Sequence, residues 1–317
     1  MAVAAAGSGP ATDPVRPAAG RGTLAGMSEP TSAAAPAGFL GHGNPMNTLA
    51  DNDFTRSWSA FGAEVRAARP RAVLVVSAHW FINASAVTAM ERPRTIHDFF
   101  GFPDELFAVD YPAPGSPEIA AAVADAVKPL WVGLDHDSWG LDHGTWSVLV
   151  HALPDADIPV IQLSVDATKP LQHHLDLGAA LAPLRAQGIA VVGSGNIVHN
   201  LRMVDFRHAG AGFDWAHRYD EAARDLLTTD PGSIAKLLEH PDHHRAVPTT
   251  DHFLPMVYLA GLAAAEGAVL DVLVEGYDAG SLSMTSYGLG CAPVVTDLSG
   301  STEVPLPTDV PPESTNL

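Results

Sequence analysis

The stretch Ala72-Val73-Leu74-Val75-Val76-Ser77-Ala78-His79-Trp80 decides the fold of this chain. It opens with an apolar, largely β-branched run between polar residues, which is typical of a strand buried on both faces. Residues 158–164, 189–193 and 268–274 have the same character and are further predicted strands. Such runs indicate a sheet that is covered on both sides.

Helical patterns alternate with these strands. Ser116 and Pro117 form a helix start, with a capping hydroxyl followed by proline at the first helical position. Gly188 is a helix-ending signal, and Asp251 is the predicted cap of a later helix. Strands alternating with helices predict an α/β fold: a single domain with a central, mainly parallel or mixed sheet flanked by helices. The predicted helices are residues 54–69, 117–130, 169–187, 217–228 and 251–266.

The two ends of the chain differ in composition from its middle. Residues 1–37 are rich in Ala, Gly, Pro and Ser, and residues 296–317 are rich in proline and lack aromatic residues. Both have little large apolar surface to offset the entropy of ordering, so we expect disordered tails around one folded domain over residues 38–295. Met27 could be the start of translation in place of Met1.

Bulk composition excludes several classes of function. The hydrophobic fraction of 47% permits a sizeable core, and the formal net charge of −19 argues against nucleic acid or an anionic membrane as partner. No apolar run approaches the roughly twenty residues of a membrane span, and no secretory signal is present. The one cysteine, Cys291, excludes an intrachain disulfide and a cysteine-built metal site. We expect a cytoplasmic protein.

Five of the fifteen histidines stand in short motifs between turn residues. Ligands of α/β sheets bind beyond the carboxyl ends of the strands. His79 follows the strand over residues 72–77, His199 follows that over residues 189–193 through a glycine-containing turn, and His42 follows Gly38-Phe39-Leu40. Histidine is the commonest metal ligand and moves protons near neutral pH. These positions indicate an imidazole-built metal site.

The other two motif histidines complete this constellation. His252 lies at the start of the last predicted helix, and His143 stands in Asp142-His143-Gly144-Thr145. The remaining histidines have no supporting motif or occur as adjacent pairs, which point in different directions on a helix. We interpret them as satisfied polar groups, with His97 and His136 as intermediate cases because of their aromatic or Asp-rich surroundings. They are His151, His173, His174, His208, His217, His240, His243 and His244.

Taken together, the motifs resemble those of the class III extradiol ring-cleaving dioxygenases of the LigB-like superfamily, in particular the 4,5-DOPA dioxygenase extradiol branch. The resemblance runs from about residue 39 to residue 294. It is carried by Gly-His-Gly-Asn-Pro, Ser-Ala-His-Trp, Asp-Phe-Phe-Gly-Phe-Pro, Tyr-Pro-Ala-Pro-Gly, Asp-His-Gly-Thr-Trp, Gly-Ser-Gly-Asn-Ile-Val-His-Asn-Leu, Asp-His-Phe-Leu-Pro and Ser-Met-Thr-Ser-Tyr, in this order.

This resemblance implies a catalytic domain with a non-haem metal centre. It places the metal ligands at His42, His79 and His252, the active-site base at His199, which could also be an additional ligand, and a second acid/base group at His143. The wider superfamily uses two histidines and one carboxylate, whereas the third ligand here is a histidine. Fe²⁺ is the metal expected for activity, and an all-imidazole site also suits Zn²⁺.

The implied reaction opens the ring of a catechol-type substrate, DOPA-like or another catechol, with O₂ and adds both oxygen atoms to it. His199 would take the proton of the catechol, and His143 would deliver a proton later. Phe99, Phe100 and Phe102, in the Gly- and Pro-rich segment of residues 95–114, are candidate pocket walls together with Tyr287, or else simply pack the loop. The sequence identifies neither the particular catechol nor the oligomeric state.

Two other functions fit the same residues. A zinc hydrolase would use the open metal site to activate a water molecule, without need of O₂. A non-enzymatic member of the superfamily would act as a binding protein. Retention of every ligand and acid/base position argues against the binding protein, and an assay without O₂ separates the hydrolase from the dioxygenase.

Overall fold

The computed structural model describes residues 34–208 and 210–291. Nearly all of both predicted tails lies outside these residues. The first strand, β1 (Ala37–Gly41), starts one residue before the predicted domain boundary. In the described part of the chain, no helix is long and apolar enough to cross a membrane.

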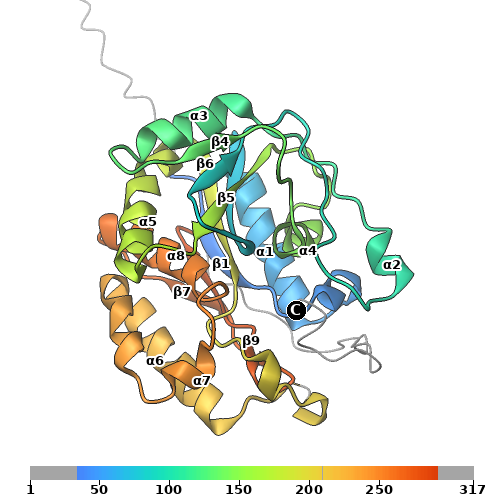
Figure 1. Ribbon diagram of the computed structural model, residues 1–317, viewed down its shortest axis with the longest axis vertical. Helices are drawn as coiled ribbons and strands as arrows, with labels where there is room; N and C mark the ends of the chain where they lie inside the picture. The colour runs from blue at the N-terminus through green and yellow to red at the C-terminus, as the bar shows by residue number, and fades with distance from the viewer. Residues whose placement is uncertain (1–33, 209, 292–317) are drawn as a thin grey trace, which may run out of the picture. The chain divides into compact units, whose positions relative to one another are not determined.

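An eight-stranded mixed sheet forms the centre of the fold, which confirms the predicted α/β class (Figure 1). Its strand order is β4-β3-β5-β2-β6-β1-β10-β7. The central strands β5, β2, β6 and β1 are parallel to one another, whereas β10 runs antiparallel to both of its neighbours, β1 and the edge strand β7. The four predicted β-branched runs correspond to β2 (Ala72–Ile82), β5 (Val160–Asp166), β6 (Ile189–Gly195) and β7 (Asp271–Val274).

Several short strands were not predicted. With two to four residues each, they are too short to show an alternating pattern. They are β3 (Ala86–Thr88), β4 (Gly133–Asp135), β10 (Ser286–Leu289), and the separate pair β8 (Tyr277–Asp278) and β9 (Leu282–Ser283).

The five predicted helices are present, with ends that differ by a few residues. Ser116 caps its helix as expected, since its side chain accepts a hydrogen bond from the Ile119 N–H at 3.3 Å. Gly188 follows another helix with a φ of 79°, where glycine is favoured. The helices are α1 (Asp53–Ala67), α3 (Pro117–Ala126), α5 (Leu171–Ala186), α6 (Asp214–Leu227) and α8 (Leu254–Ala265).

The remaining helical segments are mostly short and lie in regions for which no helix was predicted. The loop of residues 95–114 contains only one short helix, so the expectation of a largely irregular segment is confirmed. The α-helices are α2 (Asp104–Phe107), α4 (His143–Ala152) and α7 (His243–Ala246), and the 3₁₀ segments are η1 (Pro45–Leu49), η2 (Leu201–Met203), η3 (Phe206–His208) and η4 (Pro231–Glu239).

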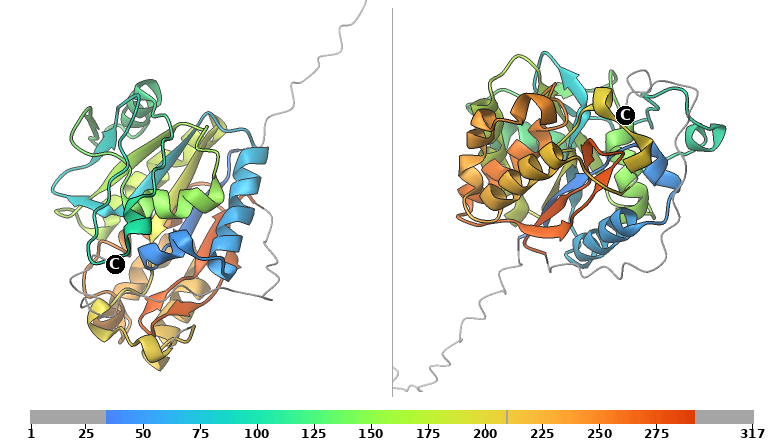
Figure 2. Two further views of the ribbon diagram at one scale, coloured as in Figure 1. Left: turned by 90° about the vertical axis from the view of Figure 1, so that its right-hand side faces the viewer. Right: turned by 90° about the horizontal axis from the view of Figure 1, so that it is seen from below.

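The helices cover both faces of the sheet (Figures 1 and 2). Alternate residues of the central strands belong to two separate clusters: Leu74 packs on the side of α5, α6 and α8, and Val73 and Val75 pack on the side of α1 and α4. Glycines bring helices close together, because a Cβ at Gly178 would collide with the Tyr258 backbone of the facing helix. A sheet packed on both faces leaves its strand ends as the place for a site.

Candidate metal centre

The ends of three adjacent strands bring the motif histidines together. His42 directly follows β1, and His199 lies four residues beyond the end of β6. The expectation that His79 follows its strand is wrong, because β2 continues through His79 to Ile82 after an irregularity in its pairing with β5. Because β2, β6 and β1 are neighbours in the sheet, their carboxyl-end segments meet although they are far apart in the sequence.

His252 belongs to a different part of the chain but lies at the same strand ends. It lies two residues before α8, and its backbone carbonyl accepts the Asn196 N–H at 2.9 Å just beyond β6. Asp251 does not cap this helix: Phe253 occupies the cap position, and no side chain bonds to the first turn. The Asp251 carboxylate instead bonds to Nδ1 of His252, with Oδ2 at 2.5 Å. The cap prediction is therefore wrong, because the ring beside Asp251 is the better partner.

Three imidazoles surround one point. The ring centroids of His42, His79 and His252 lie 4.9–5.2 Å apart in each pair. One nitrogen from each ring lies within 4.8 Å of the corresponding nitrogen of the other two. Nε2 of His42 and Nε2 of His79 are 3.2 Å apart. Two nitrogens bound at about 2.0–2.1 Å to one ion, at tetrahedral to octahedral angles, would be separated by about 2.9–3.4 Å.

Hydrogen bonds at the far side of two of these rings fix which nitrogen faces the centre. Ser194 donates its hydroxyl proton to the Gly144 carbonyl at 2.5 Å, so its Oγ accepts from Nδ1 of His42 at 2.9 Å. The carboxylate of Asp251 likewise accepts Nδ1–H of His252. Nε2 of His252 is buried and has no hydrogen-bond partner in the described structure. An unpartnered buried nitrogen that points at two other imidazoles fits a metal ligand.

Burial keeps these rings in the form that binds metal. Burial, and then the neighbouring His79, lowers the pKa of His42 well below its usual value. Burial, and then His143, lowers the pKa of His79 similarly, against the opposing charge of Asp98. Only the neutral imidazole has a lone pair to donate. The residues therefore suit a divalent cation with nitrogen ligands.

His143 and Asp98 form a second group beside the three imidazoles. The His143 ring lies 3.8 Å from that of His79, and its Nδ1 is 2.9 Å from Oδ1 of Asp98. The other carboxylate oxygen lies 3.5 Å from Nδ1 of His79. Burial tends to raise the pKa of Asp98, but His143 and His79 outweigh it and hold the pKa below its usual range. Asp98 thus stays ionised and orients both rings.

Asp142 holds His143 in place from the other side. Fully buried, it caps α4 by accepting the Thr145 N–H at 3.1 Å, and it also accepts the Ser77 hydroxyl of β2 at 2.7 Å. Burial, and then the charge of Asp98, raises the pKa of Asp142 to about 6. The cap fixes the first residue of α4, which is His143.

His199 lies flat against a metal-site histidine. Its ring is stacked on that of His252 at 3.5 Å with 4° between the planes, and its backbone N–H donates to the Ala246 carbonyl at 2.8 Å. The structure therefore brings all five motif histidines into one cluster.

The predicted pocket aromatics divide into two groups. Phe99 is buried with its ring edge-on to His143 at 5.4 Å, and Phe102 packs against Phe99 at 5.3 Å. Phe100 is exposed, and Tyr287 is buried in the core cluster that also holds Tyr219. Phe99 therefore lies at the site, whereas Tyr287 lies in the core.

Four of the other histidines make structural contacts through their rings. Their rings bond to tyrosine hydroxyls or backbone carbonyls: His174 to Tyr258, His243 to Tyr219, His151 to Asn47 and His97 to Val109. Sequence reasoning missed Asp98 and Ser194 as partners of the site histidines. Asp98 begins one of the quoted motifs and Ser194 lies inside another, but nothing local to either residue shows which ring it contacts.

The chain is similar to proteins of known family. A family model described as the catalytic LigB subunit of aromatic ring-opening dioxygenase matches residues 38–290. A 4,5-DOPA dioxygenase extradiol of Escherichia coli (strain K12) is 45% identical over 259 residues, which cover 80% of this chain and 94% of that protein. A protein of the same name from Beta vulgaris is 35% identical over 260 residues, 78% of this chain and 94% of that protein.

A solved structure shows the same fold. The crystal structure of an uncharacterized protein from Escherichia coli K12 matches with a TM-score of 0.70 and 42% sequence identity, over 80% of this chain and 99% of that one.

Proposed function

The chain belongs to the LigB family of aromatic ring-opening dioxygenases, and on that premise we propose that it is an extradiol dioxygenase that opens a catechol-type ring with O₂. The observation that carries this proposal is the convergence of His42, His79 and His252, with the nitrogen of His252 that faces the other rings buried and unpartnered. Relatives named for 4,5-DOPA make DOPA the first catechol to test.

His42, His79 and His252 are the proposed metal ligands. Fe²⁺ is the proposed metal for activity, and Zn²⁺ also fits three imidazoles. A bound Fe²⁺ would hold catechol and O₂ side by side and lower the pKa of the catechol hydroxyls. Ser194 and Asp251 each hold one ring by its Nδ1–H, which keeps Nε2 directed inward.

His199 is the proposed base that takes a proton from the catechol. Its stacking on His252 fixes the ring beside a proposed ligand, where a base could act on a catechol held at the metal. The backbone bond to Ala246 limits movement of this segment. The same proximity would let His199 serve as an additional ligand.

His143 is the proposed proton donor. Oδ1 of Asp98 lies 2.9 Å from Nδ1 of His143, and Nε2 of His143 is buried without a hydrogen-bond partner in the described structure. That nitrogen can hold a proton and hand it to a substrate oxygen. Phe99 packs edge-on to the ring and keeps water from it.

Anaerobic loading with Fe²⁺ tests the proposal. The loaded protein is mixed with DOPA and other catechols, and O₂ is then admitted. We expect a yellow ring-opened product that forms only after O₂ is present. Hydrolysis of esters without O₂ would favour a zinc hydrolase, and no turnover by the metal-loaded protein would favour a binding protein.

Variants separate the proposed roles. His42→Ala or His79→Ala should lose metal and activity together. His199→Ala should retain metal but turn over about 10²–10⁴-fold more slowly, the usual contribution of a positioned base. His136→Ala, at an exposed position in a loop, is the matched control. Near-normal ring cleavage by the His199 variant would remove that residue from the role of base.

A further inference from the structure

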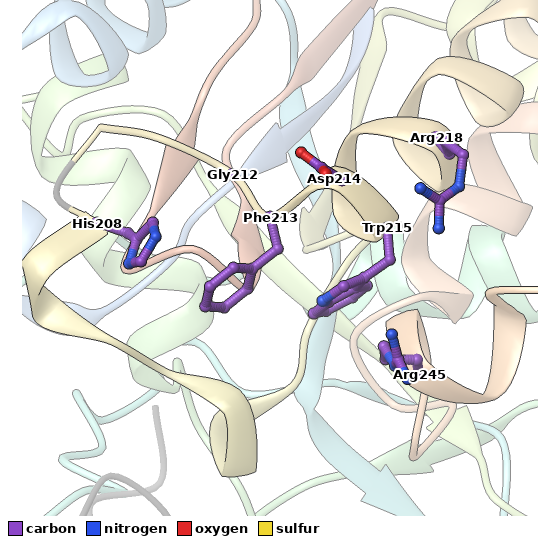
Figure 3. Close-up of a pocket in the computed structure, with 7 residues that line it drawn as sticks. All are labelled: His208, Gly212, Phe213, Asp214, Trp215, Arg218 and Arg245. Carbon is purple, nitrogen blue, oxygen red and sulfur yellow. The ribbon is translucent and has the colours of Figure 1, made fainter.

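A pocket separate from the histidine cluster lies where the segment before α6, the first turns of α6, and α7 meet (Figure 3). Its volume is about 450 Å³. Trp215 and Phe213 contribute aromatic rings to its wall, and Arg218 and Arg245 contribute guanidinium groups. None of these residues belongs to the histidine cluster.

The aromatic side of the pocket is an ordered shelf. The rings of Phe213 and Trp215 are stacked at 5.9 Å with 24° between their planes, and the His208 ring continues the row at 4.7 Å from Phe213. Trp215 is buried, so its position is fixed by the core beneath it. Phe213 is half-buried, so a flat apolar group could contact its ring beside Trp215.

The charges in the pocket are unevenly compensated. Arg218 is held by Asp242 through two hydrogen bonds of 2.9 and 3.1 Å, which neutralise it locally. Arg245 lies over the Trp215 ring, with its guanidinium carbon 5.8 Å from the ring centroid. It makes no ion pair and no side-chain hydrogen bond with any described residue. The carboxylate of Asp214 points away from both Trp215 and Arg245 (Figure 3). Arg245 therefore offers its N–H donors to a ligand.

The pocket is attached to the segment that carries His199. The carbonyl of Arg245 accepts a hydrogen bond from the Asn200 side chain at 2.7 Å, and the next carbonyl accepts the His199 N–H. The Phe213 N–H, at the aromatic side of the pocket, donates to the Gly280 carbonyl at 2.8 Å. Two residues further along, Leu282 forms an isolated antiparallel β-bridge with His199. These hydrogen bonds thus link the segments that line the pocket to the segment that carries His199.

We infer that this pocket binds a carboxylate that is attached to a small apolar or aromatic group. The carboxylate would pair with the guanidinium of Arg245, whose planar donors match its two oxygens, and the apolar part would lie on Phe213 and Trp215. Cation–π contact with Trp215 holds the guanidinium in place beforehand. The carboxylate comes either from the ring substituent of a substrate catechol, an assignment that rests on the proposed function, or from a separate compound.

Binding of 3-phenylpropionate to the full-length protein tests the inference, since this probe has the carboxylate and the ring but no catechol to cleave. Its affinity is measured calorimetrically with metal retained and again after chelation. We expect 3-phenylpropan-1-ol, the neutral analogue, to bind at least about 10-fold more weakly, because charged hydrogen bonds are lost. Arg245→Met should weaken binding of the acid by a similar factor, and Arg245→Lys by less.

Arg224→Met is the matched control, since Arg224 lies on α6, which also carries Arg218 of the pocket, and pairs with Glu275 outside the pocket. Its affinity for the acid should equal that of the unaltered protein. Thermal unfolding verifies that the variants are folded. Equal binding of the acid and the alcohol, or full affinity in Arg245→Met, would overturn the inference. Binding of the acid that occurs only with metal present would also overturn the inference, because the probe would then be a ligand of the metal.

Kinetics with two catechols identify the source of the carboxylate. The first catechol, dihydroxyphenylpropionate, carries a carboxylate on its side chain, and the second, ethylcatechol, has an uncharged side chain. If Arg245→Met weakens apparent binding of the acidic catechol about 10-fold, measured through its KM, and leaves the neutral catechol unaffected, the substrate supplies the carboxylate. If both KM values stay unchanged while the variant has lost phenylpropionate binding, a separate compound supplies it. Failure of the unaltered protein to cleave these two catechols, DOPA and the rest of the panel would refute the proposed function and leave the binding result standing.

Discussion

Asp251→Asn tests the metal centre through a residue that does not face the metal. Nδ1 of His252 lies 2.5 Å from the Asp251 carboxylate, and its Nε2 is buried without a partner in the described structure. Burial raises the pKa of Asp251, but His252 outweighs it and lowers the pKa overall, so the carboxylate is ionised at neutral pH. Asparagine has the same shape, and its amide oxygen can still accept the Nδ1–H bond. The change therefore removes charge and keeps the ring orientation.

The size of the effect follows from the hydrogen bond. A bond to an ionised partner contributes about 1.5–3 kcal/mol, against about 0.5–1.5 kcal/mol for a neutral pair. The difference of about 1–1.5 kcal/mol corresponds to roughly 10-fold in metal affinity. Partners of metal-bound histidines affect affinity by about 10–100-fold when they are replaced, so 10-fold is the lower end of the expected loss.

Competition with a chromogenic chelator under anaerobic conditions measures the affinity for Fe²⁺ at pH 7. Asp225→Asn is the control, because Asp225 is exposed on α6 and its replacement changes the net charge by the same amount. An Fe²⁺ affinity of Asp251→Asn within twofold of the unaltered protein would refute the reasoning, since the charge of Asp251 would then not strengthen metal binding by His252. A loss of the same size in the control would attribute the effect to net charge.

Three further substitutions test the close packing at Gly62, the metal centre and a buried carboxylate. Gly62→Ala should destabilise the fold by about 1–3 kcal/mol in urea unfolding, because its Cβ would collide with the Ala152 carbonyl, whereas Gly232→Ala meets only ordinary contacts and should have little effect. Ser194→Ala removes the acceptor of a ligand Nδ1–H and should weaken Fe²⁺ binding in the chelator assay about 10-fold without loss of folding. Burial raises the pKa of Asp220, so the folded state holds that proton more tightly and this group's contribution to stability falls as the pH rises from about 4 through the folded pKa. In Asp220→Asn, which resembles the protonated acid, the decline should be absent from unfolding curves between pH 4 and pH 8, and an unchanged pH dependence would contradict this.

The sequence by itself determined the elements whose signal is local. The runs that became β5 and β6 are buried throughout, and a continuous apolar run reports burial on both faces without knowledge of its neighbours. Ser116 and Gly188 marked helix ends because capping depends on a few adjacent residues. The histidine motifs were visible for the same reason, and the family resemblance supplied their roles as expectations.

Only the tertiary structure decided which groups touch. Ser194 holds a ring 152 residues away in the sequence, and the amide of His143 bonds to Asp98 across 45 residues. The Ser194 pair forms because strand order places β1 beside β6, and strand order leaves no mark in a local pattern. Asp251 illustrates the difference: its sequence position allowed a helix cap, but its carboxylate instead bonds the adjacent ring where the other imidazoles converge.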